Sequence, residues 1–96
     1  EYYEKSAELG NSSALNNLGS LYKNGHGVDR DYNKAKEYYE KSAELCNSDA
    51  LNNLGSLYEN GNGVEKNIHK AIEYYKQSAE LGNKSADEKL KKLCKV

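Results

Sequence analysis

One ten-residue phrase occurs three times in this chain of 96 residues, and its spacing constrains the fold more than any other feature. It reads EYYEKSAELG at 1–10, EYYEKSAELC at 37–46 and EYYKQSAELG at 73–82. The copies begin 36 residues apart, and residues 1–36 agree with residues 37–72 at 26 positions. A fixed period between about 20 and 50 residues is the signature of a stacked repeat architecture. We therefore expect successive units to meet equivalent neighbours.

The first half of each period has the pattern of an amphipathic helix, which we call helix A. In the first unit its apolar residues recur at the spacing of one helical face. They are Ala14, Leu15, Leu18, Leu21 and Tyr22. Asn11 and Ser12 precede the helix as N-cap residues, and Asn24 with Gly25 supplies a stop signal. The loop NGHGV follows, and its Val28 is expected to pack on the core.

The second half predicts another helix, helix B, with Asp31 as its cap. One face carries Ala35, Tyr38, Tyr39, Ser42 and Ala43, and the other face is charged. Because neither helix can bury its apolar stripe alone, the pairs should stack. The prediction is an all-α, right-handed α/α superhelical solenoid of antiparallel helix pairs. Gly19 and Gly55 interrupt helix A at the same phase, which predicts close approach of a tyrosine from helix B.

The period divides the chain into one domain of several units. Residues 1–10 are assigned to helix B of a preceding repeat, 11–46 and 47–82 to two full repeats, and 83–96 to a C-terminal capping helix. The last unit is more polar, with Asp87 in the place of Leu15, as a capping helix requires. The chain opens on Glu1, so an upstream segment is expected to have been removed or left out.

Composition narrows the classes of partner. The formal net charge is -1, with 14 basic and 15 acidic residues interspersed, so no net field attracts nucleic acid or anionic lipid. No apolar run approaches the roughly 18 residues of a membrane-spanning helix. Cys46 and Cys94 occupy different phases of the repeat, and both are expected to be free thiols, with Cys94 partly packed. Two unpaired thiols slightly favour a cytosolic setting.

The stretch ALNNLGSLYKNGHGVDRDYNKAKEYYEKSAEL, with its A, LG, Y, GxGV, KA, YY and A positions, resembles the Sel-one-like repeat family, a relative of the tetratricopeptide repeats. The likeness covers essentially the whole chain. It implies an adaptor that binds proteins, with no catalysis and no cofactor. Some secreted members carry two cysteines per repeat joined as a disulfide. This chain has Ala43 and Ala50 at those positions, so it does not match that subgroup.

The side of helix A opposite its apolar stripe is where a protein or peptide partner is expected. The predicted contact residues are Asn16, Asn17, Ser20, Lys23, Asn52, Asn53, Ser56 and Glu59. Side-chain amides both donate and accept hydrogen bonds, as recognition of a peptide backbone requires. The alternative is that they only solvate the groove and tie layers together. Lys23, Glu59 and Lys95 share one repeat position and are expected to form an exposed ladder of alternating charge.

No residue pattern predicts catalysis or metal binding. His26 and His69 have no second ligand at metal spacing, and neither cysteine has a histidine in evident reach. Asn11 and Asn83 fit the glycosylation sequon, but a helix cap already explains asparagine at that phase. The first prediction is therefore a protein-binding scaffold. The alternative is a structural module that associates with itself through Tyr2, Tyr3 and Ala7, which helix B of residues 1–9 would expose.

Overall fold

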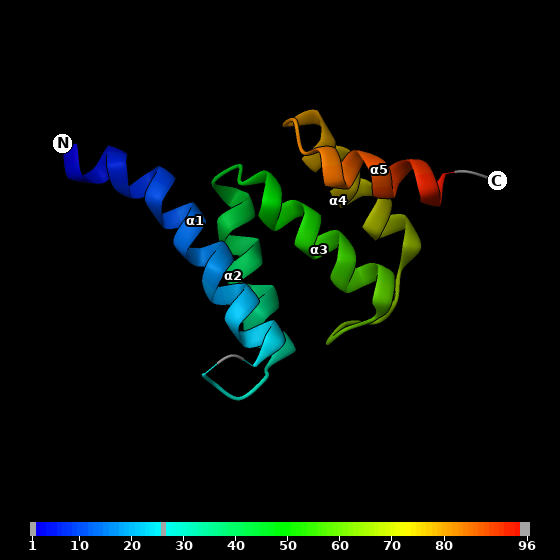
Figure 1. The fold of residues 1–96 in the computed structure, drawn as a ribbon, viewed down its shortest axis with the longest axis horizontal. Helices are drawn as coiled ribbons and strands as arrows, with labels where there is room; N and C mark the ends of the chain where they lie inside the picture. The colour runs from blue at the N-terminus through cyan, green and yellow to red at the C-terminus, as the bar shows by residue number, and fades with distance from the viewer. Residues whose placement is uncertain (1, 26, 95–96) are drawn as a thin grey trace.

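The computed structural model of the chain describes residues 2–25 and 27–94, with the backbone alone for residues 2–11. The described residues form the helices α1 (Tyr2–Asn24), α2 (Tyr32–Glu44), α3 (Ser48–Asn60), α4 (Ile68–Glu80) and α5 (Lys84–Leu93). Each helix packs mainly against its neighbours in chain order (Figure 1). The fold is thus an all-α repeat of stacked helix pairs, as predicted.

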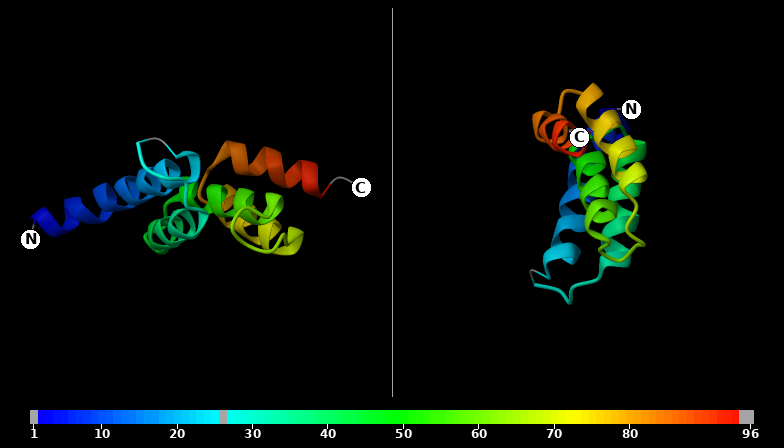
Figure 2. Two further views of the ribbon diagram at one scale, coloured as in Figure 1. Left: turned by 90° about the horizontal axis from the view of Figure 1, so that it is seen from below. Right: turned by 90° about the vertical axis from the view of Figure 1, so that its right-hand side faces the viewer.

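The helices are arranged in a thin slab that measures 48 × 31 × 17 Å. Seen edge-on, α1 and α5 lie on one side and α2 and α4 on the other, and α3 packs against α2 and α4 (Figure 2). Helices A and helices B therefore form opposite faces of the molecule. Among the described residues, no helix has the length and apolarity needed to cross a lipid bilayer.

Side-chain caps fix where four of the helices begin. The capping residues are Asp31, Asn47, Asn67 and Asn83, and each accepts a hydrogen bond from the backbone N–H three residues later at 2.9 to 3.1 Å. These bonds satisfy N–H groups that the helix itself leaves unpaired. At the other end, Gly25 and Gly61 follow α1 and α3 with positive φ angles of 73° and 72°. The cap at Asp31 and the stop at Gly25 are confirmed.

The core of each layer depends on a tyrosine that lies against a glycine. A Cβ atom on Gly19 would come within 2.7 Å of the ring of Tyr39, and one on Gly55 within 2.6 Å of the ring of Tyr75. Both rings are fully buried. The predicted close approach is therefore confirmed, since only a residue without Cβ leaves space for the ring.

Around these tyrosines, small and aliphatic side chains form two connected clusters. The first contains Ala35, Tyr39, Ala50, Leu54 and Leu57, and the second Tyr58, Ala71, Tyr75 and Ala86. Val64 and Tyr74 pack against both. The predicted anchoring of the loop is thus confirmed at Val64. It is wrong for the equivalent Val28, which is 38% exposed.

Helix α1 continues through a point where the repeat predicts a turn. The period places a helix end at Gly10 and a new helix after it, yet one helix covers Tyr2–Asn24. At the equivalent points, Cys46 and Gly82 take positive φ angles of 63° and 97°, and the chain reverses. The expected helix boundary at residues 10–11 is therefore wrong. The assignment of residues 1–10 to a preceding repeat stays a prediction.

The two observed turns lie beside hydrogen bonds that join the end of helix B to the start of helix A in the same unit. The hydroxyl of Ser42 donates to the backbone oxygen of Ser12, and that of Ser78 donates to Ser48 at 2.6 Å. Each bond joins residues 30 positions apart. The side chain of Ser6 lies outside the described residues, so the equivalent bond is not described.

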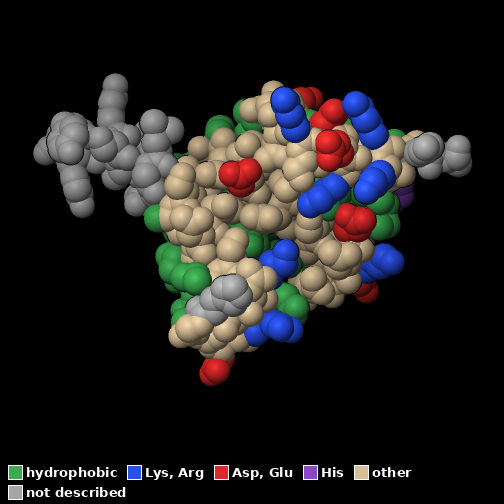
Figure 3. All heavy atoms as spheres, viewed as in Figure 1, with side chains coloured by type: hydrophobic (Ala, Val, Ile, Leu, Met, Phe, Trp, Pro, Cys, Tyr) green, Lys and Arg blue, Asp and Glu red, His purple; other side chains and the backbone are tan. Residues whose placement is uncertain are grey.

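One side of α1 is exposed because no other helix of the described residues packs on it. Ala14, Leu18 and Leu21 are exposed, the leucines by 36% and 40%, so the predicted burial is wrong for these three. Their equivalents Leu54 and Leu57 are buried because α2 packs on them. Figure 3 shows hydrophobic side chains along the edge of the molecule formed by α1.

The tyrosine contact leads to a test of stability. We expect Gly55→Val to lower the free energy of unfolding by about 2–3 kcal/mol, because the added groups must displace a fully buried ring. Glu73→Val, at an exposed position of α4, is the control for the helix propensity of valine and should cost less than about 1 kcal/mol. Urea unfolding followed by circular dichroism measures both. Equal losses would show that the tyrosine contact does not limit the space at Gly55.

Candidate functional site

The residues predicted to contact a partner lie on α1 and α3. Figure 3 shows the side of the molecule formed by α1, α3 and α5, and the centre of this side carries few charged side chains. Hydrogen bonds within the chain engage most of the predicted residues, as described below. Whether any of them binds a partner stays a prediction.

An amide pair joins the first two layers. Asn53 donates from Nδ2 to Oδ1 of Asn16 at 2.9 Å, across 37 residues of sequence. This bond supports the alternative that asparagines at these positions tie layers together. Asn17, at the repeat position of Asn53, is exposed on α1. It therefore presents an amide on the surface of the first unit.

The second and third layers are joined by a chain of hydrogen bonds that ends in a carboxylate. Lys89 donates to the hydroxyl of Ser56 at 3.0 Å, and Tyr75 donates to Oε1 of Glu59 at 2.6 Å. Ser56 and Tyr75 are joined at 3.2 Å. Since the phenol proton is used on Glu59, the serine donates to the phenol. Ser56 and Glu59 are thus engaged inside the protein.

The first unit lacks this carboxylate. Ser20 and the phenol of Tyr39 are joined at 3.0 Å, but Lys23 stands at the repeat position of Glu59. The expected charge ladder of Lys23, Glu59 and Lys95 is not formed between the first two, because Glu59 accepts from Tyr75. Neither has an ion pair within residues 2–25 and 27–94. Lys95 lies outside the described residues.

Lys89 is the amine of this network, and it is partly buried. Burial lowers the pKa of Lys89; the charge of Glu59 opposes that effect, and the charge of Lys23 adds to it. The amine therefore loses part of its hydration without a full ion pair. A bound anionic group of a partner would restore that stabilisation.

Asn52 differs from its neighbours on this side of α3. Its Oδ1 atom is the one buried side-chain polar atom with no hydrogen-bond partner among the described residues. An unpaired buried oxygen costs roughly 1–3 kcal/mol. The sequence indicated Asn52 as a candidate, but its unpaired state depends on the packing around α3.

The other residues that could take part in catalysis or metal binding do not lie close together. His69 is exposed on α4, and His26 lies outside the described residues. No group of three or more His, Cys, Asp or Glu side chains within the described part of the chain is placed to hold a metal ion. Cys46 and Cys94 are free and exposed. The prediction of free thiols is confirmed, whereas partial packing of Cys94 is wrong.

Asn83 acts as a structural residue. Its Oδ1 caps α5, and its Nδ2 donates to the carboxylate of Asp49 at 2.9 Å. The interpretation of Asn83 as a helix cap is therefore confirmed. The side chain of Asn11 lies outside the described residues.

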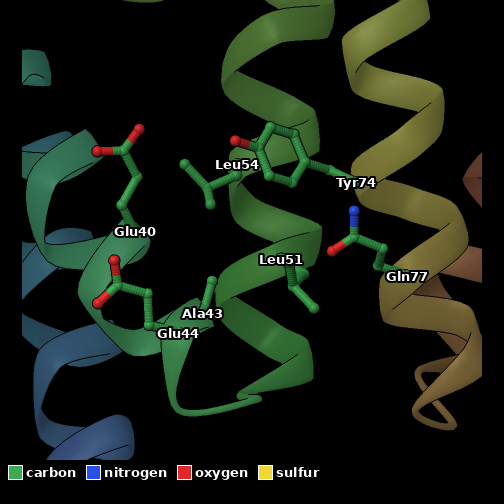
Figure 4. A pocket seen from close by; sticks show the side chains of 7 residues that line it. All are labelled: Glu40, Ala43, Glu44, Leu51, Leu54, Tyr74 and Gln77. Carbon is green, nitrogen blue, oxygen red and sulfur yellow. The ribbon is translucent and has the colours of Figure 1, made fainter.

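A groove on the opposite face was not predicted from the sequence. It lies between α2 and α4, with α3 as its floor (Figure 4), and has a volume of about 360 Å³. Three helices from two units contribute to it, so no single repeat contains its pattern. One sequence signal was present, because Gln77 replaces the lysine that the repeat has at position 41.

Comparison with known proteins assigns the family. The Sel1 repeat pattern matches residues 1–11, 12–45 and 48–83. The chain belongs to the Sel1 repeat family. A comparison with curated proteins gives no match.

Solved structures of Sel1 repeat proteins have the same fold. A Sel1 repeat protein from Oxalobacter formigenes is 37% identical with a TM-score of 0.84, over 86% of this chain and 34% of that one. A protective antigen of uropathogenic Escherichia coli with this fold is 34% identical with a TM-score of 0.80, over 92% of this chain and 19% of that one. Cysteine rich protein B of Helicobacter pylori is 34% identical, TM-score 0.79, over 93% and 67%. The chain thus spans about a third and a fifth of the first two proteins.

The buried phenol of Tyr75 leads to a prediction of pH dependence. Burial raises the pKa of Tyr75, and so does its hydrogen bond to Glu59, while Ser56 lowers it. The unfolded chain therefore releases this proton first as the pH rises through about 10, and the stability that the neutral phenol provides is lost above that pH. Tyr75→Phe should be less stable at pH 8 but decline less steeply between pH 9 and 11.

The measurement is urea unfolding of both proteins at pH 8, 9.5 and 11. One such group contributes at most about 1.4 kcal/mol per pH unit. Burial also raises the pKa of Tyr39 and Tyr74, so part of the decline should remain in the variant. Identical slopes would contradict the role assigned to the phenol of Tyr75.

Proposed function

We propose that the chain is a non-enzymatic scaffold that binds a protein or peptide segment along the polar side of α1 and α3. Sel1 repeats commonly mediate protein interactions, and the chain has stacked helix pairs of this kind. The proposal involves no catalytic residue, cofactor, nucleic acid or membrane. The partner is a segment with free backbone N–H and C=O groups, which side-chain amides recognise.

The unpaired oxygen of Asn52 supports this proposal most directly. Its neighbours Asn53 and Ser56 have partners inside the chain, whereas Oδ1 of Asn52 has none among the described residues. Rotation of the Asn52 side chain would bring this buried oxygen to a partner N–H, and the bond would recover the cost of leaving the oxygen unpaired. Asn17 and Lys23 on α1 lie on the same side and extend the surface into the first unit.

The test begins by selecting, from a random displayed library, a peptide that binds the intact chain. The affinity of this peptide is then measured by fluorescence anisotropy. Asn52→Ala should weaken binding about tenfold, as expected for one lost hydrogen bond in a dry contact. Its melting temperature should not fall, because the oxygen has no partner to lose. Asn33→Ala is the control, since Asn33 is exposed on α2. Equal affinities of both variants would exclude the polar side of α3 as the site.

A second candidate function is self-association, which the exposed leucines of α1 favour. Leu18 and Leu21 lie three residues apart on one helix, and the same positions are buried between layers in the second unit. A head-to-tail contact through this surface would continue the stack of repeats. Light scattering over a hundredfold range of concentration should then show a mass that rises with concentration. Leu21→Lys should abolish the rise, and a constant monomer mass would exclude this function.

A further inference from the structure

The groove between α2 and α4 has an apolar floor and an acidic rim. It is lined by Glu40, Ala43, Glu44, Leu51, Leu54, Tyr74 and Gln77. In Figure 4 the ring of Tyr74 and the amide of Gln77 extend from α4 over the floor, and the two glutamates stand on α2. Its volume of about 360 Å³ is within the range of small-ligand sites. The groove can therefore accept one long side chain.

The charge of the rim is not balanced within the chain. Lys36 pairs with Glu40 at 3.8 Å, but both side chains are partly exposed, and such a pair is weak. Glu44 forms no ion pair with any residue that the structure describes. The two carboxylates lie one helical turn apart on the same side of α2, so one cation can contact both.

The tyrosines of the repeat show what kind of group is missing. Two stacked pairs, Tyr22 with Tyr38 and Tyr58 with Tyr74, have ring centroids 5.7 Å apart. Three of these rings have a lysine amine close to the ring centroid: Lys34 at 5.1 Å from Tyr22, Lys41 at 5.9 Å from Tyr38, and Lys70 at 5.0 Å from Tyr58. Tyr74 has no such cation among the described residues, because the equivalent of Lys41 is Gln77.

We propose that this groove binds an arginine side chain of a partner protein, with the guanidinium group between Glu40, Glu44 and the ring of Tyr74. The methylene groups of the arginine would cover Leu51 and Leu54. Arginine fits better than lysine because its planar group stacks on an aromatic ring and bridges two carboxylates. Consistent with this, burial raises the pKa of Tyr74, and the charge of Glu40, which lines the same groove, raises it further.

This site is separate from the proposed peptide surface. At roughly 100° per residue, the mean direction of Leu51 and Leu54 lies about 140° around α3 from the mean direction of Asn52, Ser56 and Glu59. The two proposals can therefore fail independently. A partner could contact one face or, by passing around the edge of the slab, both.

The experiment uses the intact ¹⁵N-labelled chain and two peptides, acetyl-Leu-Arg-Leu-amide and the same peptide with citrulline, which is neutral and nearly the same shape. Titration with the arginine peptide should shift the backbone amide NMR signals of residues 40–44 and 74–77. The arginine peptide should bind about tenfold tighter than the citrulline peptide. Equal affinities would overturn the proposal, because the charge would then not be recognised.

Three variants locate the site. Glu44→Gln should weaken binding of the arginine peptide about fivefold, while Glu80→Gln, the same change at the equivalent exposed position of α4, should leave it unchanged. Gln77→Lys restores the lysine of the first unit and should fill the place of the arginine, with about tenfold weaker binding. Ser85→Lys adds the same charge on α5 as its control. Equal changes in affinity within either matched pair of variants would show that net charge alone attracts the peptide. That result would overturn the proposed site.

Discussion

The contact between a buried tyrosine ring and a glycine determines the geometry of each layer. Tyr39 and Tyr75 lie where any Cβ on Gly19 or Gly55 would overlap the ring. The contact sets how closely helix A and helix B approach. It also carries a polar group into the core, because the phenol must find a hydrogen-bond partner there. The serine after each glycine provides it, at 3.0 and 3.2 Å.

This requirement explains why the side of helix A opposite its apolar stripe is polar but not free. In the second unit the phenol connects Ser56 with Glu59, and Lys89 of the next layer joins the same network. Polar residues that look available in the sequence are therefore partly used for folding. Those without an internal bond, above all Asn52, are the better candidates for recognition.

The sequence predicts the features that local chemistry controls. The period, the cap at Asp31, the stop at Gly25 and the glycine contacts all follow from residue types at fixed spacing. The exposure of Leu18 and Leu21 does not follow from residue type, because leucines at equivalent repeat positions are buried or exposed according to which helix lies beside them. The turn expected at Gly10 is not observed, and the two observed turns lie beside bonds between residues 30 positions apart, which no local pattern of residues reveals.

The proposal for the groove between α2 and α4 depends on a difference between copies of the repeat and not on the repeat itself. Identical positions in successive units preserve contacts that every layer needs, as with Gly19 and Gly55. A change at a rim position removes an internal contact without disturbing the core. Lys41 satisfies the ring of its own unit, whereas Gln77 leaves Tyr74 with its acidic neighbour and no cation among the described residues. The proposal of a cation at this ring therefore depends on the one rim position where the second unit departs from the first.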